Sequence, residues 1–150
     1  MNPAVLKAGQ IAKLDIIVNM NRLSRVPIDL VKAQLFLDQA NEAMSELIKI
    51  STNQVRYDIA YNIAHDVGEA LLAAYGFRTA SGQGQHTAVG EFLEIILVGG
   101  PSESAAADFN ALREGRNSLR YQAKPIGQLQ ADFACVTAQT LLNGVQIILL

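Results

Sequence analysis

The residues best suited to chemistry are three arginines, Arg113, Arg116 and Arg120, which fall within one predicted helix over residues 103–121. At about 100° per residue, their side chains share an arc of about 60° on that helix. A guanidinium is a planar fork of hydrogen-bond donors that matches the oxygens of a phosphate. Like charges at these spacings repel one another, so an anion beside them lowers the energy. The arrangement is compatible with a phosphate-binding site formed by the three arginines.

Arg116 falls inside the apolar stripe of the same helix, which is formed by Phe109, Leu112 and Leu119. A charge on a core-facing stripe is costly unless it is paired. The structural explanation is an ion pair with a carboxylate of a neighbouring helix, and three are available: Glu69, Glu91 and Glu94. The functional explanation is a phosphate contact. Gly115, which costs about 1 kcal/mol relative to alanine within a helix, indicates close approach of another backbone or a ligand.

The two histidines, His65 and His86, are weaker candidates for a catalytic base. His65 precedes Glu69 by one helical turn, a spacing typical of a surface pair. His86 follows a polar, glycine-rich loop over residues 79–85, which lacks the lysine and the preceding strand of a phosphate-binding P-loop. Neither histidine has the neighbouring ligands of a metal site, and no dinucleotide motif occurs. The sequence therefore predicts no metal and no cofactor.

The composition is typical of one folded domain spanning residues 1–150. Half of the residues are apolar and 17% are charged, which argues against disorder. The net charge of −2 gives no global positive field, so any nucleic-acid binding has to rest on a local cluster. Cys135 lies in an apolar stretch, is expected to be a buried small side chain, and as a single cysteine fits a reducing compartment. Without a signal-peptide pattern or a membrane-spanning apolar run, we expect a cytoplasmic protein that contacts no membrane.

Periodicity predicts an all-α fold, an up-and-down bundle of five to six helices. The predicted helices cover roughly residues 4–22, 29–50, 51–76, 87–98, 103–121 and 125–149. Asp29 and Ser102 are expected N-caps, and Gly76 is an expected C-terminal stop. No stretch shows the alternation of a β-strand.

The last predicted helix is expected to face the core with its larger apolar residues. This inner face is predicted to contain Ile126, Leu129, Phe133, Val136 and Thr140. The apolar run that closes the chain, 147–150, is expected to pack in the core or against a second subunit.

The run from Arg116 to Tyr121, Arg-Asn-Ser-Leu-Arg-Tyr, resembles the hallmark of the HEPN superfamily of small helical bundles. That hallmark is an arginine, commonly followed by a polar residue such as asparagine, and a histidine four to six positions further on. Arg116 and Asn117 match its first half, and Tyr121 stands where the histidine is expected. Two further segments support the resemblance: 56–65 and 69–78. The resemblance covers about residues 30–145 and implies a HEPN-like helical bundle.

The resemblance implies a homodimer in which two copies of the motif meet at a cleft and act without a metal or a cofactor. In the members that cut RNA, the arginine holds the scissile phosphate and the histidine helps to activate the ribose 2′-hydroxyl. The implied catalytic residues here are Arg116, Asn117 and Tyr121, with His86 and His65 as auxiliary groups from elsewhere in the fold. A phenol with a pKa near 10 is a poor base at neutral pH, although it can donate a hydrogen bond to a phosphate.

Three functions stay open on the sequence. The first is a metal-independent endoribonuclease of a toxin–antitoxin or defence system, whose partners would be RNA and an antitoxin or a nucleotidyltransferase. The second is a non-catalytic HEPN module that binds RNA, a nucleotide or a protein partner through the same cleft. The third is a helical oligomerisation domain whose arginines form salt bridges.

Overall fold

The computed structural model describes residues 1–81 and 85–150, and for residues 85 and 86 the backbone alone. Within these residues the chain forms six helices and two short strands, which confirms the all-α bundle. In chain order the elements are α1 (Ala8–Asn19), β1 (Leu23–Arg25), α2 (Leu30–Leu47), α3 (Asn53–Tyr75), β2 (Phe77–Thr79), α4 (Gln85–Ile96), α5 (Glu103–Gln122) and α6 (Gln128–Leu149). The glycine-rich loop predicted over residues 79–85 falls partly on residues 82–84, which lie outside the described residues.

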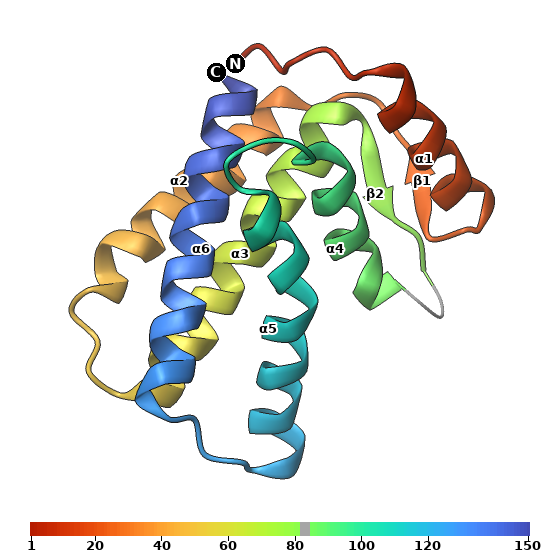
Figure 1. Ribbon diagram of the computed structural model, residues 1–150. Coiled ribbons are helices and arrows are strands. Elements are labelled where there is room, and N and C mark those ends of the chain that lie inside the picture. The colour runs from red at the N-terminus through yellow and green to blue at the C-terminus, as the bar shows by residue number, and fades with distance from the viewer. Residues whose placement is uncertain (82–84) are drawn as a thin grey trace.

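α3 is the central helix of the bundle, and α2, α4, α5 and α6 pack around it. In Figure 1, α6 lies in front of α3, with α2 on one side and α5 on the other. The two ends of the chain meet at the top of the same view. There the backbone N–H groups of Asn2 and Ala4 donate to the carbonyl oxygens of Leu149 and Ile148, at 2.8 and 3.0 Å. The last turn of α6 is therefore held in place by the N-terminal segment.

The prediction that the chain has no β-structure is wrong at one place. β1 pairs antiparallel with β2, with Leu23 opposite Thr79 and Arg25 opposite Phe77. Each strand has only three residues, too few for an alternating pattern to be recognised in the sequence. The pair carries Leu23 and Phe77 into the core.

The predicted helix ends are confirmed where capping chemistry marked them. The Asp29 carboxylate accepts a hydrogen bond from the backbone N–H of Lys32 at 2.8 Å. Ser102 occupies the N-cap position of α5, although its side chain makes no capping hydrogen bond. Gly76 ends α3 with a φ of +77°, a left-handed conformation that favours glycine. A Cβ atom at Gly76 would also lie 2.8 Å from the carbonyl oxygen of Val26, so this position has a second reason to be glycine.

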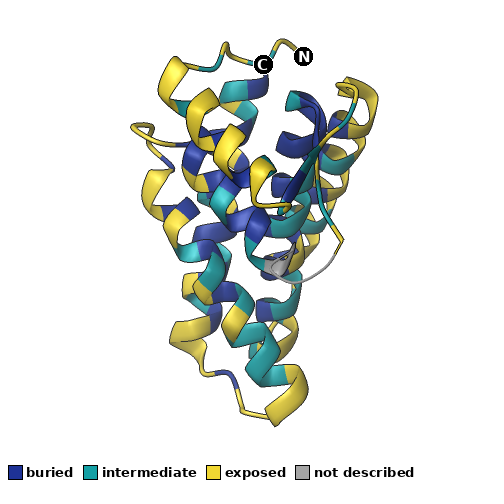
Figure 2. Cartoon of the chain, turned by 90° about the vertical axis from the view of Figure 1, so that its right-hand side faces the viewer, coloured by how far each residue is buried: buried dark blue, intermediate teal, exposed yellow. Residues whose placement is uncertain are grey.

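The buried apolar side chains form one continuous cluster between the helices. Figure 2 shows these buried positions along the centre of the molecule and exposed positions on its outer faces. α3 contributes twelve buried residues, more than any other helix within the described part of the chain. On α5, Phe109 and Leu112 are fully buried and Leu119 packs against the core, so the apolar stripe predicted for this helix is confirmed.

The inner face predicted for the last helix is wrong, except that Ile126, just before α6, is buried. Leu129, Phe133 and Val136 are 84%, 45% and 65% exposed, and Thr140 is half-buried. The buried face of α6 is Ala131, Ala134, Thr137, Ala138, Leu141, Leu142, Gly144, Val145 and Leu149. Close packing of two helices selects small residues where the backbones approach, and the prediction instead favoured the largest apolar side chains.

Among the described residues, α6 is the one helix whose length and composition would allow it to cross a membrane. Nine of its 22 residues are buried in the core of the bundle, mainly against α3. Residues 147–150 were predicted to pack in the core or against a second subunit. Leu149 is buried in the core, whereas Ile147 and Leu150 are 66% and 85% exposed.

Candidate phosphate-binding site

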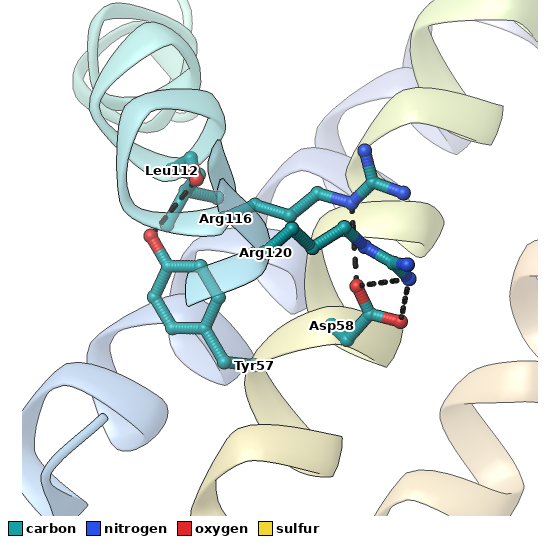
Figure 3. A network of polar contacts seen from close by, with 5 residues as sticks. All are labelled: Tyr57, Asp58, Leu112, Arg116 and Arg120. Atoms are coloured by element: carbon teal, nitrogen blue, oxygen red, sulfur yellow. Dashed lines mark hydrogen bonds and ion pairs between the residues drawn. The ribbon is translucent and has the colours of Figure 1, made fainter. Parts of the chain in front are cut away.

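Asp58 on α3 holds two of the three predicted arginines of α5. Arg116 donates from Nε to Asp58 Oδ1 at 3.2 Å, and Arg120 donates from Nη2 to both carboxylate oxygens at 3.1 and 3.0 Å. Figure 3 shows the two guanidiniums reaching across from α5 to the same carboxylate. Arg116 and Arg120 are one helical turn apart, so their side chains extend in the same direction.

The ring of Tyr61 forms the apolar floor beside Arg116. The guanidinium carbon of Arg116 lies 5.0 Å from the ring centroid, within the range of a cation–π contact, and Phe109 stacks on the same ring at 5.8 Å. Burial raises the pKa of Tyr61, and the charges of Arg116 and Arg113 partly oppose that rise. Tyr61 therefore stays a neutral phenol at physiological pH.

Gly115 is a point of close contact between α5 and α3, but the approaching group is a side chain and not the backbone or ligand that was predicted. The Tyr57 hydroxyl donates to the carbonyl oxygen of Leu112 at 2.9 Å, a buried contact visible in Figure 3. A Cβ atom at Gly115 would lie only 2.1 Å from that hydroxyl oxygen. The approaching group is thus the Tyr57 side chain, and its contacts with Leu112 and Gly115 define where α5 packs along α3.

Arg113 lies half-buried near Tyr61, and its Nε atom is buried without a hydrogen-bond partner among the described residues. One turn earlier on α5, the Oδ1 atom of Asn110 is also buried and unpaired, and the Asn110 amide packs over Gly90 of α4. A buried donor without a partner costs about 1–3 kcal/mol. The unpaired Nε atom of Arg113 is closed to solvent, so it is an unsatisfied internal donor and not one exposed to a ligand.

Asn117 and Tyr121 do not join the pair of arginines at Asp58. The two residues continue the helical row of Arg113 at i+4 and i+8, whereas Arg116 and Arg120 form the adjacent row. Asn117 is half-buried, and the Tyr121 side chain is 84% exposed. Tyr121 thus faces solvent at the last turn of α5, and no described contact prepares it to act as a base.

Of the two predicted auxiliary histidines, His65 lies beside the cluster through Tyr61. Its ring centroid is 6.2 Å from that of Tyr61, and its Nε2 atom is 3.8 Å from Glu69 Oε1, which fits the predicted surface pair. His86 belongs to the first turn of α4, and the structure describes only its backbone. The structure therefore places His65 close to the Tyr61 ring that Arg116 contacts, and it places Tyr121 elsewhere.

The carboxylates predicted as partners of Arg116 are engaged elsewhere or lie outside the cluster. Glu91 pairs with Arg22, and Glu69 lies beside His65, while Glu94 is exposed. The sequence prediction did not include Asp58 as a partner of Arg116, although the spacing of residues on α3 could have indicated it. Asp58, Tyr61 and His65 recur at i, i+3 and i+7, the spacing of one face of a helix, and this face is the one that meets α5.

The cluster as a whole carries an excess of positive charge. Arg116 and Arg120 share the single carboxylate of Asp58, Arg113 lies near Tyr61, and the side chains of Asp58 and Arg116 are 27% and 29% exposed. Asp58 occupies only part of the donor set, since Arg116 uses its Nε atom and leaves both terminal nitrogens without a described hydrogen bond. Partly exposed guanidiniums with unused donors suit the binding of a phosphate.

The cavities and the single cysteine offer less chemistry than the arginine cluster. Two cavities of about 480 Å³ each are lined by other residues than the three arginines. Cys135 borders one of them and is half-buried, and burial raises the pKa of its thiol although Arg56 opposes this. A raised pKa leaves little thiolate, so Cys135 is not an activated nucleophile.

No group of side chains suited to a metal ion occurs within residues 1–81 and 87–150.

Comparison with protein-family models, with curated proteins and with solved structures finds no match for this chain.

Proposed function

We propose that this protein is a HEPN-type module that binds the phosphate backbone of RNA at the cluster of Arg113, Arg116 and Arg120, without cleaving it. The observation that carries the proposal is that Arg116 and Arg120 converge on Asp58, while both terminal nitrogens of Arg116 make no described hydrogen bond. Asp58 is an internal anion in the place that a phosphate would take or share. The adjacent Tyr61 ring is buried, at 8% exposed, and holds the Arg116 guanidinium through a cation–π contact.

The observation against catalysis is the position of Tyr121. A base has to lie within hydrogen-bond reach of the proton that it removes, and Tyr121 is exposed on the neighbouring row of α5. Its hydroxyl can still contact a phosphate of a bound strand. The module would accordingly hold RNA, a nucleotide or a nucleotide-bearing partner.

A second candidate function, metal-independent RNA cleavage of the toxin–antitoxin or defence type, rests on one observation. Both His65 and Arg116 contact the ring of Tyr61, so an imidazole and a guanidinium flank the same aromatic surface. In this candidate His65 would act as the base and Arg116 as the phosphate contact. The homodimer, the antitoxin or nucleotidyltransferase partner and the cytoplasmic location expected from the sequence stay predictions.

The test is one experiment with two measurements on the same samples. Fluorescence anisotropy with a single-stranded RNA gives the Kd, and gel analysis in EDTA detects cleavage. Loss of a charged hydrogen bond is worth about 1.5–3 kcal/mol, so Arg116→Ala is expected to weaken binding roughly 10- to 100-fold. The matched control is Arg25→Ala, which removes an arginine that pairs with Asp15 on another part of the surface.

Intact RNA together with weaker binding by Arg116→Ala supports the binding module. Cleavage by the wild type that disappears in both Arg116→Ala and His65→Ala replaces it with the nuclease. Equal binding by Arg116→Ala and the wild type, with both variants folded by circular dichroism, overturns the phosphate site itself.

A further inference from the structure

α6 is apolar on two faces, and only one of them is used inside the bundle. The buried face packs mainly on α3. The opposite face carries Leu129, Phe133, Val136 and Ile147, which are 84%, 45%, 65% and 66% exposed. We call these four residues, together with Thr140, the α6 stripe. Its members recur every three or four residues except between Thr140 and Ile147, so they share one side of the helix over about 27 Å.

The α6 stripe is electrically neutral. Among the 22 residues of α6, Asp132 is the one that carries a charge, and it pairs with Arg56 of α3 at 2.6 Å. The polar side chains that flank the stripe are amides already engaged within the chain: Gln139 donates to Asn143, and Gln146 donates to Asn41 of α2. The Thr140 hydroxyl donates to the carbonyl oxygen of Val136 and so leaves its methyl group on the stripe. A surface of this kind complements another neutral apolar surface rather than a charged partner.

The α6 stripe is also complementary to itself. In an antiparallel pair of α6 helices related by a two-fold axis, Leu129 of one copy would face Ile147 of the other, and Val136 would face Thr140. Phe133 would face the level of Asn143, where the stripe has no large side chain to obstruct the ring. From this neutrality and self-match, we infer that a second copy of this chain covers the α6 stripe and forms an antiparallel two-fold dimer.

The size of the surface sets the expected affinity. α6 is about 33 Å long and about 10 Å wide, which gives roughly 330 Å² per copy, against the approximately 800 Å² of a standard interface. The neighbouring cavity of about 480 Å³ extends the surface toward α2 with a mixed lining, which is apolar at Ile48 and Ile50 and holds the paired charges of Arg56 and Asp132. Dissociation constants in the micromolar range are therefore expected, with a concentration-dependent dimer.

This dimer is independent of the proposed RNA site. Arg56 and Asp58 are two residues apart on α3, so their side chains point about 200° apart around its axis. Arg56 reaches Asp132 of α6, whereas Asp58 reaches Arg116 of α5. The α6 dimer would leave the arginine cluster of each copy on an outer surface. This arrangement differs from the shared cleft that the HEPN resemblance implies.

Sedimentation velocity of the full chain between about 1 and 200 μM tests the inference. The wild type is expected to shift from monomer to dimer, and Val136→Lys is expected to stay monomeric with an unchanged circular dichroism spectrum. Ile16→Lys is the matched control, because Ile16 is a similarly exposed residue, at 58%, on α1. A wild type that is monomeric throughout, or a Val136→Lys variant that still dimerises, overturns the proposal.

A charge pairing tests the antiparallel register. Leu129→Lys and Ile147→Glu are each expected to be monomeric alone and to form a heterodimer when mixed, since the two introduced side chains would then face each other with opposite charges. A mixture of Leu129→Lys with Leu129→Glu is expected to stay monomeric. Dimers in this second mixture but not in the first overturn the antiparallel arrangement. Wild-type chains that float with neutral phosphatidylcholine vesicles instead of dimerising would assign the stripe to a lipid surface and overturn the second copy.

Discussion

Arg116 of α5 reaches Asp58 of α3 with its Nε atom at 3.2 Å, and this one contact connects the sequence motif with the fold. Asp58 holds Arg120 through both of its oxygens, so a single carboxylate orders two guanidiniums of like charge. Asp58 therefore organises the pair of arginines, and in the proposed function it would compete with a phosphate for them.

Removing the charge of Asp58 is expected to strengthen RNA binding. In Asp58→Asn the three arginines keep their positive charges without the internal anion. A charge contact at about 4 Å is worth about 1 kcal/mol in water, so the Kd is expected to fall roughly fivefold. The slope of log Kd against log salt should also become steeper, by about 0.7 for each further phosphate engaged. Anisotropy titrations at several salt concentrations measure both quantities.

Asp132→Asn is the control for this variant, because it removes a carboxylate that pairs with Arg56 on the other side of α3. Its RNA affinity should match the wild type. An Asp58→Asn protein that is folded and binds RNA more weakly than the wild type contradicts the role given to Asp58 as a competitor.

Gly115→Ala is expected to destabilise the protein although alanine favours helices. The new Cβ atom would meet the Tyr57 hydroxyl at 2.1 Å, and overpacking costs about 1–3 kcal/mol against a helix gain of about 1 kcal/mol. A net loss of up to about 2 kcal/mol should lower Tm by several degrees. Thermal unfolding followed by circular dichroism measures this loss.

Gly9→Ala provides the comparison, since no atom lies within 4 Å of a Cβ at that position. This variant should be as stable as the wild type or more so. Adding Tyr57→Phe to Gly115→Ala removes the closest atom and should restore part of the stability. Equal Tm values for Gly115→Ala and the wild type would show that Tyr57 does not set the approach of α5 to α3.

Asp66→Asn is expected to stabilise the protein at neutral pH. Burial raises the pKa of Asp66 in the folded protein, with the charge of His65 opposing the rise and Glu69 adding to it. A carboxyl whose folded pKa is raised contributes stability below its unfolded pKa and loses that contribution as the pH rises through the folded value. The variant should therefore unfold at a higher urea concentration than the wild type at pH 7.

The advantage of Asp66→Asn should disappear as the pH falls toward the unfolded pKa of a carboxyl, near 3.9. Urea titrations at pH 7 and at pH 4 measure the difference, and Asp38→Asn, at an exposed position on α2, serves as the control. A stabilisation that is equally large at both pH values would mean that burial of the charge is not its cause.

The sequence by itself determined the helices, because helix formation depends on local periodicity and on end residues such as Asp29 and Gly76. It also determined that three arginines share one side of α5, since this follows from helical geometry alone. The close approach at Gly115 could be predicted because a glycine within a helix is unfavourable without such a reason.

Only the tertiary structure decided which groups meet between helices. The choice of Asp58 over Glu69, Glu91 and Glu94 depends on how α5 lies on α3, and all four carboxylates are compatible with the local pattern. The choice of the small-residue face of α6 depends on the close approach of α3, which leaves Leu129, Phe133 and Val136 exposed. Local spacing places side chains around one helix axis, whereas packing between helices selects which of those sides is buried and which charges are paired.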